Sequence, residues 1–304
     1  MNRTIINFVI LTVSSVLVST STWAQQPSQP DTTPHEIQFI EVEKGVSLEV
    51  LDWGGKGYPI VLLPGLGMSA HQFDAFALKL STRFHVYGIT RRGFGASSKP
   101  SMGYDIPRLV DDIVVVLDAL KLKRPLLIGH SVSGQELSLI GVTHPDRVAG
   151  LVYLDAAVDY TFLPSDEYQA LLKAVAPDSP GLANTSERPA SLVGLPPFRQ
   201  IVLSTLKPEY ARIAVPALGL VAVPRDPASW WFQNYAALTT ESRAKVDRMF
   251  VINLENVHLQ TKLFLTAPKS KVVRLVGADH MIYRSNEQEV LDAIFAFAKE
   301  SDWK

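Results

Sequence analysis

The chain has 304 residues, a formal net charge of −1, 47% hydrophobic residues and no cysteine. Its near-neutral charge gives no electrostatic basis for binding nucleic acid or an anionic membrane surface. The lack of cysteine excludes disulfides, thiolate metal sites and a cysteine nucleophile.

The N-terminus has the pattern of a secretory signal peptide. A positive start at Arg3 precedes an uncharged run over residues 5–18, and the small residues Thr22 and Ala24 stand at −3 and −1 of a cleavage site. The run is shorter than the roughly 20 residues that a membrane-spanning helix needs. We therefore expect cleavage after Ala24 and export to the periplasm or the medium, with an uncleaved anchor as the alternative. The polar, proline-rich residues 25–35 are expected to form a flexible leader.

Residues 36–304 are expected to form one α/β domain, a mostly parallel, doubly wound sheet with helices on its faces, because short apolar runs alternate with helical patterns. The expected strands are residues 37–42, 47–53, 59–65, 84–90, 125–130, 148–155, 216–223 and 271–277, and the expected helices include residues 106–120, 132–144 and 287–300. No segment after the leader is apolar enough to span a bilayer. The segment from about residue 156 to 215 is too long for a simple connection, and we expect it to form a lid inserted after the sixth strand.

The stretch GHSVSG, residues 129–134, lies between an expected strand and an expected helix. This is the place of the G-x-S-x-G nucleophile elbow, in which a tight turn lifts a serine above the sheet. Ser131 has Gly129 two residues before it and Ser133 two residues after it, whereas centring on Ser133 would put Gln135 at the second position. The pattern favours Ser131 as the nucleophile. The alternative is that both serines only cap the following helix.

Three further stretches follow expected strands: LLPGLGMSAHQF, TRRGFGASSKP and VGADHMIY. In order and spacing they are similar to the H-G-x-x turn, the R-G-x-G-x-S segment and the late G-x-x-H of the α/β-hydrolase superfamily. The chain from about residue 37 to 300 therefore resembles an exported, serine esterase-like member of that superfamily. The resemblance implies an α/β-hydrolase fold and a small-molecule ester or related acyl substrate that is cleaved through an acyl-serine intermediate, with no cofactor and no metal.

Serine-dependent hydrolysis needs a general base and donors for the oxyanion. His280 follows the last strand, so it is expected at the same sheet edge as Ser131 and is the candidate base; the other six histidines do not share this placement. The candidate oxyanion donors are the backbone N–H groups of Leu66 and Val132. Pro64 stands where many relatives have a histidine, and the change removes a side chain that often braces this loop.

Two carboxylates could orient the base. Asp226 follows the seventh strand, the commonest position, but it stands one residue late, behind Pro224. Asp155 follows the sixth strand, 24 residues after Ser131, and this arrangement resembles that of haloalkane dehalogenases. Both candidates stay open, with a slight preference for Asp155.

An aromatic cluster lies just past the seventh strand: Trp230, Trp231, Phe232 and Tyr235. Ligands of open α/β sheets bind at this edge, so the cluster predicts an apolar acyl pocket. The alternative is that these rings are ordinary core.

Two other classes of function stay as alternatives. GLGMSA, residues 65–70, also matches a dinucleotide-binding fingerprint, and Arg91 and Arg92 could hold a 2′-phosphate, which would make the protein an NADP-dependent reductase. The acid expected about 20 residues later is missing, because Ile89, Thr90 and Arg91 stand there. A non-catalytic binding protein on a hydrolase fold is the second alternative.

Overall fold

The computed structural model describes residues 33–161, 165–176, 191–230 and 235–300. The expected signal peptide and most of the leader, up to residue 32, lie outside the described residues.

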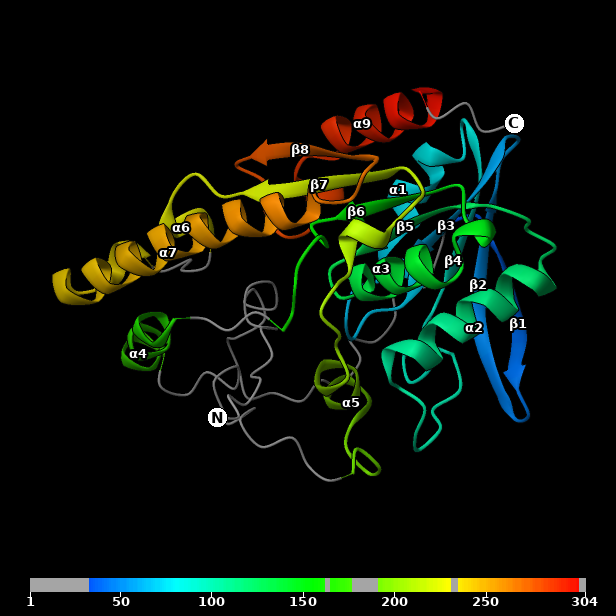
Figure 1. Ribbon diagram of the computed structural model, residues 1–304, viewed down its shortest axis with the longest axis horizontal. Coiled ribbons are helices and arrows are strands. Elements are labelled where there is room, and N and C mark those ends of the chain that lie inside the picture. Colours follow the sequence, from blue (N-terminus) through cyan, green and yellow to red (C-terminus); the bar gives the residue numbers. More distant parts are fainter. Residues whose placement is uncertain (1–32, 162–164, 177–190, 231–234, 301–304) are drawn as a thin grey trace.

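An eight-stranded sheet forms the centre of the molecule, with the strand order β1-β2-β4-β3-β5-β6-β7-β8 (Figure 1). The strands are β1 (Glu36–Glu43), β2 (Val46–Gly54), β3 (Tyr58–Leu63), β4 (Phe84–Ile89), β5 (Leu126–His130), β6 (Gly150–Leu154), β7 (Ala217–Val223) and β8 (Ser270–Val276). β2 pairs antiparallel with β1 and β4, and every other pair is parallel. The predicted fold class, a mostly parallel sheet of the α/β-hydrolase type, is confirmed.

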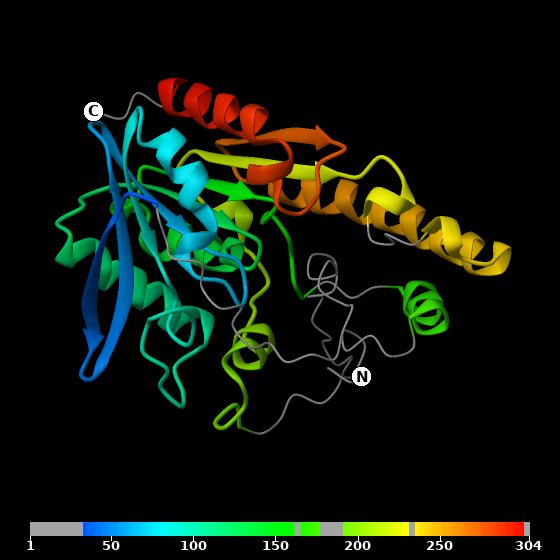
Figure 2. The ribbon, with the colours of Figure 1, turned by 180° about the vertical axis from the view of Figure 1, so that it is seen from behind.

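Helices cover both faces of the sheet, as the two opposite views show (Figures 1 and 2). On one face α2 (Ile106–Ala119), α3 (Ser133–Thr143) and the end of α7 (Thr240–Phe264) pack against the strands, and on the other face lie α1 (Asp74–Leu80), α8 (Ile282–Ser285) and α9 (Glu287–Glu300). The short 3-10 helix η2 (Ala70–Phe73) precedes α1. The strands β5 and β6 are buried along their whole length, as expected of central parallel strands.

The predicted helix over residues 106–120 forms for the reasons that its sequence suggested. Asp105 caps it by accepting a hydrogen bond from the backbone N–H of Arg108 (3.1 Å), and Pro107 stands in the first turn. Its apolar stripe, which includes Leu109 and Ile113, is buried against the sheet.

The helix α7, with 25 residues, was not among the elements predicted from the sequence. Its first half extends beyond the sheet, where α4 (Asp166–Val175) packs on it through Tyr168, Leu172, Met249 and Ile252 (Figure 1). α4 and α5 (Pro197–Leu203) both belong to the segment between β6 and β7 that was expected to form a lid. Among the described residues, no helix combines the length and the apolar character that crossing a membrane requires.

Parallel strands place their carboxyl ends at one edge of the sheet. The segments that follow β3, β5, β6 and β8 therefore converge, although they are far apart in the sequence. These segments contain Leu66, Ser131, Asp155 and His280, respectively.

Candidate active site

Ser131 occupies the sharp turn between β5 and α3. Its backbone has φ of 57°, a left-handed conformation that is unfavourable for a residue other than glycine. The backbone N–H of Ser131 donates to the carbonyl oxygen of Leu154 on β6 (3.2 Å), which helps to hold the turn. This is the geometry of a nucleophile elbow.

The departure from G-x-S-x-G at Ser133 has a structural reason. A β-carbon at Gly134 would lie 1.8 Å from the carbonyl oxygen of Ala156, so the close approach of α3 requires glycine at residue 134. Ser133 is fully buried, and its hydroxyl donates to the carbonyl oxygen of Pro64 (2.6 Å). The two serines therefore have different environments, and Ser133 makes contacts of its own instead of merely filling space.

His280 lies in the loop between β8 and α8 and contacts a carboxylate. Its Nδ1 is 2.7 Å from Oδ2 of Asp155. The other oxygen, Oδ1, accepts a hydrogen bond from the backbone N–H of Ala222 on β7 (3.0 Å). Because an ionised carboxylate only accepts, this contact assigns the hydrogen to Nδ1 and leaves Nε2 of His280 as an acceptor.

Asp226, the other candidate acid, lies elsewhere. It is exposed, and its Oδ1 accepts a hydrogen bond from the backbone N–H of Ser229 (2.7 Å) in α6 (Pro227–Trp230). These bonds with Ser229 lower the pKa of the Asp226 carboxyl. Of the two carboxylates that the sequence left open, the structure brings Asp155 to His280, whereas Asp226 caps its own turn.

His130 lies directly behind the candidate base. Its Nε2 is 3.0 Å from the backbone carbonyl oxygen of His280, and the two ring centroids are 4.5 Å apart. Burial, with smaller contributions from the charges of His280 and Arg284, lowers the pKa of His130 well below its usual value. The neutral ring can donate from Nε2 and so fix the main chain of His280. His130 was not among the site residues predicted from the sequence, where its position next to Ser131 is the only signal of a role.

The loop after β3, residues 64–69, contacts the elbow; we call it the β3 loop. A β-carbon at Gly65 would lie 2.8 Å from Nδ1 of His130 and 3.5 Å from Cβ of Ser131, so only glycine allows this approach. The side chains of Leu66 and Val132 belong to one apolar cluster. Within the described part of the chain, neither of their backbone N–H groups donates to another residue. Both candidate oxyanion donors thus lie in segments that contact the turn at Ser131.

The structure describes little of the expected aromatic pocket. Trp231, Phe232 and the side chain of Trp230 lie outside the described residues. Tyr235 donates its hydroxyl hydrogen to Oδ1 of Asp247 on α7 (2.6 Å). The pocket therefore stays a prediction.

One group of side chains could hold a metal ion by geometry. His35, His71 and Asp74 offer ligand atoms within 4.8 Å of one another. Hydrogen bonds with Asp74 and Glu49 raise the pKa of His71 to about 10, so its ring is protonated at neutral pH. A metal ion would have to displace that proton. In the metal-free protein these ion pairs instead fix η2, which follows the β3 loop.

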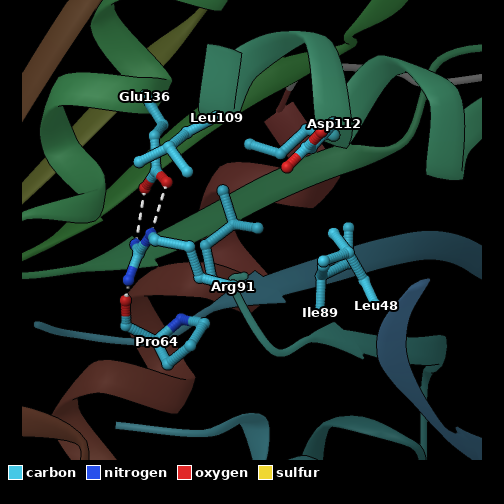
Figure 3. Close-up of a pocket in the computed structure, with 9 residues that line it drawn as sticks. Leu48, Pro64, Ile89, Arg91, Leu109, Asp112 and Glu136 are labelled. Atoms are coloured by element: carbon cyan, nitrogen blue, oxygen red, sulfur yellow. Dashed lines mark hydrogen bonds and ion pairs between the residues drawn. The ribbon is translucent and has the colours of Figure 1, made fainter. Parts of the chain in front are cut away.

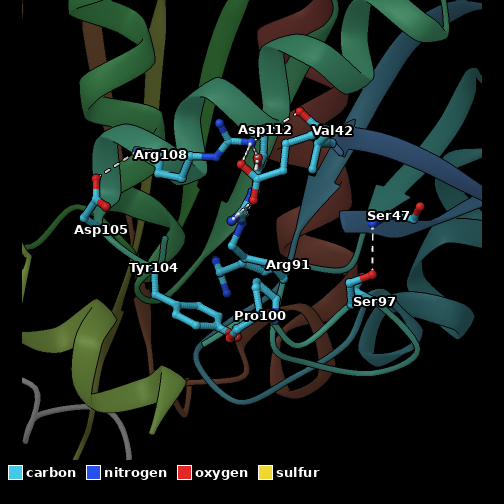
Figure 4. A network of polar contacts seen from close by, with 12 residues as sticks. Val42, Ser47, Arg91, Ser97, Pro100, Tyr104, Asp105, Arg108 and Asp112 are labelled. Atoms are coloured by element: carbon cyan, nitrogen blue, oxygen red, sulfur yellow. Dashed lines mark hydrogen bonds and ion pairs between the residues drawn. The ribbon is translucent and has the colours of Figure 1, made fainter. Parts of the chain in front are cut away.

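The two arginines that could have held a 2′-phosphate are both buried in ion pairs. Arg91 pairs with Glu136, and Arg92 pairs with Asp112 at 2.6 Å. Figure 4 shows Asp112 also contacting Arg108. Because neither guanidinium is available to a cofactor, the structure gives the reductase alternative no support.

Comparison with known proteins supplies the family. The model of the alpha/beta hydrolase family matches residues 60–293. A non-heme chloroperoxidase of Streptomyces lividans is 33% identical over 120 residues, which cover 38% of this chain and 44% of that protein. The bifunctional esterase/perhydrolase DCH of Acinetobacter calcoaceticus is 30% identical over 121 residues, covering 39% of this chain and 44% of that protein. The chain thus spans less than half the length of these curated relatives.

Among solved structures, E-2-(acetamidomethylene)succinate hydrolase superposes with a TM-score of 0.58 at 19% identity, covering 88% of this chain and 100% of that one. A likeness at this identity shows the fold alone. The family model, by contrast, matches well over half of the chain. The chain therefore belongs to the alpha/beta hydrolase family.

Proposed function

We propose that the protein is a serine hydrolase that cleaves carboxylic esters through an acyl intermediate on Ser131. The observation that carries the proposal is the 2.7 Å contact between His280 Nδ1 and Asp155 Oδ2, at the sheet edge where the strained turn presents Ser131. A histidine oriented by a carboxylate beside an elbow serine is the arrangement that activates a hydroxyl nucleophile.

Each residue then has a defined role. His280 Nε2 takes the proton from Ser131 Oγ as that oxygen attacks the acyl carbon, and the N–H groups of Leu66 and Val132 hold the oxyanion. Asp155 holds the imidazole in the required tautomer and stabilises the imidazolium. The imidazolium gives its proton to the leaving alcohol. A water that His280 deprotonates then attacks the acyl carbon, the bond from this carbon to Ser131 Oγ breaks, His280 returns the proton to Ser131, and the acid is released.

The surroundings of the proposed oxyanion donors favour an apolar acyl group. Leu66 and Val132 share their apolar cluster with Phe94 and with Ile201 of α5. Leu66 and Phe94 are partly exposed members of this cluster, and they would hold the acyl chain by removing its apolar area from water. The name of one relative, a bifunctional esterase/perhydrolase, also supports ester cleavage.

The reaction can be tested by covalent labelling and turnover. A fluorophosphonate probe should modify Ser131, as identified by peptide mass spectrometry, and p-nitrophenyl esters of rising acyl length should be hydrolysed. The Ser131→Ala variant is the control for both measurements. Labelling at another residue, or turnover that Ser131→Ala leaves unchanged, would contradict the proposal.

We also propose that the protein is exported, on the strength of the signal-like pattern that ends at Ala24. Expression of the full chain should yield a mature protein in the periplasm or medium that begins at Gln25, as read by N-terminal sequencing. A cytoplasmic protein that keeps residues 1–24 would contradict this.

A further inference from the structure

Arg91 is a buried side chain that joins two parts of the candidate site. It follows β4, and its Nε and Nη2 donate to the two carboxylate oxygens of Glu136 on α3, at 2.6 and 2.7 Å. Figure 3 shows Arg91 between Glu136 and Pro64, beside a small cavity that is otherwise largely apolar. A charged pair in such surroundings is tolerated only when its hydrogen bonds are satisfied.

The remaining donors of this guanidinium point at the β3 loop. Nη2 also donates to the carbonyl oxygen of Pro64 (3.0 Å), and Nη1 donates to that of Gly65 (3.4 Å). Ser133 Oγ accepts from Arg91 Nη2 (2.8 Å) and donates to the same Pro64 oxygen (2.6 Å). One side chain thus ties α3, which begins at the elbow, to the loop that contacts the elbow.

The geometry of a peptide unit explains why these carbonyl contacts matter. The carbonyl of Gly65 and the N–H of Leu66 belong to one planar trans peptide, so they point in opposite directions. A donor that holds the carbonyl on the inner side therefore fixes the direction of the N–H on the other side. A cationic donor also polarises the peptide and strengthens the N–H as a donor.

We propose that Arg91 is a positioning residue for the oxyanion site: it aligns the Leu66 N–H by holding the carbonyls of Pro64 and Gly65. It would thereby supply the bracing that is lost where Pro64 replaces a histidine. The inference rests on the proposed function, because only that function gives the Leu66 N–H a role in the reaction.

Arg92 offers a matched control in the adjacent position. It is also buried, and it also makes a two-pronged pair with a carboxylate, Asp112, at 2.6 and 2.7 Å. Its third partner is Glu43 (3.0 Å), and its hydrogen bonds within the described part of the chain do not include the β3 loop. Arg92→Lys should therefore cost stability as Arg91→Lys does, without disturbing the loop.

The first measurement is steady-state ester hydrolysis. Arg91→Lys keeps a charge beside Glu136 but loses the planar fork, so it cannot hold Glu136 and both loop carbonyls at once. Removal of a complete oxyanion donor costs about 10²–10³ in kcat, so a misaligned donor should cost about 10- to 100-fold in kcat with little change in KM. Arg92→Lys should stay within about threefold of the wild type, the loss expected when the loop is undisturbed.

Two further readouts separate positioning from stability. The affinity of a trifluoromethyl ketone, whose serine adduct carries an oxyanion, should fall in Arg91→Lys in step with kcat/KM and stay unchanged in Arg92→Lys. Amide hydrogen exchange over residues 65–69 should be faster in Arg91→Lys only, above all at Met68, whose N–H donates to the Gly65 carbonyl oxygen (3.3 Å). The exchange measurement needs no substrate, so the alignment of the loop can fail its test independently of the proposed function.

A second variant allows the test to be made even if Arg91→Lys does not fold. Arg91→Gln combined with Glu136→Gln removes both charges and leaves no unpaired buried charge. If Arg91→Lys does not fold, this double variant should show the same loss of kcat and the same faster exchange. The inference is overturned if a folded Arg91 variant keeps wild-type kcat, inhibitor affinity and exchange, or if Arg92→Lys changes all three to the same extent.

Discussion

The ends of β6 and β7 are neighbours in the sheet, and each is followed by an aspartate. The two aspartates differ in exposure and in the contacts that they make. After β6, Asp155 has φ of 46°, its side chain is 16% exposed, and its two carboxylate oxygens contact His280 and the backbone of β7. After β7, Asp226 is exposed and bonds with Ser229, three residues along the chain. One carboxylate is held by distant elements, and the other is held by its own turn.

This difference shows what makes a carboxylate suitable for orienting a base. Asp155 is largely shielded from water, and its hydrogen bonds fix both of its carboxylate oxygens. The position of the imidazole that it contacts is therefore fixed as well. Asp226 is surrounded by water, where contacts are screened and side chains are free to move. The strand end alone does not decide the role, because both residues satisfy that criterion.

The largest expected effect tests whether the reaction occurs at Ser131, at the carboxyl end of β5. Ser131→Ala should lose essentially all ester turnover, because the attacking oxygen is removed. Ser133→Ala is the matched control and should keep most of it, because Arg91 still holds the carbonyl of Pro64. The rate of p-nitrophenol release by the two variants shows which serine is the nucleophile. Labelling of Ser133 by a fluorophosphonate would contradict the assignment of Ser131.

The next effect compares the two aspartates directly. Asp155→Asn should lower kcat by on the order of 10⁴, because an amide can leave the histidine in the wrong tautomer. Asp226→Asn should change kcat little, since its side chain only caps a turn, and asparagine caps about as well as aspartate. Equal, small losses from both substitutions would mean that neither residue orients His280.

A smaller effect concerns binding at the end of β7. If the aromatic residues there line the acyl pocket, Trp230→Ala should shift the preferred acyl length several-fold while changing the melting temperature little. Tyr235→Phe, which removes only the hydroxyl that donates to Asp247, is the control and should leave the acyl profile unchanged. If Trp230→Ala instead loses a few kcal/mol of stability, the usual cost of removing a core aromatic, and leaves the acyl-length preference unchanged, then Trp230 is part of the core.

The smallest effect measures how strongly His130, at the end of β5, is shielded from water. Because His130 has its pKa lowered by burial, the unfolded chain binds a proton below about pH 6.5 that the folded protein does not. Stability should therefore fall as the pH drops from 6.5 to 5, by at most about 1.4 kcal/mol per pH unit from this residue. His130→Gln, which keeps a donor for the His280 carbonyl, should reduce that slope in urea titrations.

His71 provides the control of opposite sign. Its pKa is raised to about 10, so its stabilising contribution is complete below pH 6.5 and is lost as the pH rises through 10. His71→Gln should therefore flatten the alkaline part of the stability profile and leave the slope below pH 6.5 largely intact. An unchanged acid slope in His130→Gln would show that His130 is not a neutral, desolvated group in the folded protein.

Much of the fold could be predicted because its signals are local. Apolar runs of strand length, a capping aspartate at residue 105 and a stripe of period 3.6 are all properties of a few neighbouring residues. α7 was missed because its buried positions include the polar residues Asn253 and Asn256, which weaken the stripe.

The sequence by itself determined the strand pattern, and hence the sheet edge to which Ser131, Asp155 and His280 belong. Only the tertiary structure decided which aspartate meets the histidine, because that contact joins residues 125 positions apart and depends on the backbone direction at Asp155. The same holds for Arg91, whose partners lie on α3 and in the β3 loop. Side-chain directions at loop positions follow from packing between distant elements, which no local pattern encodes.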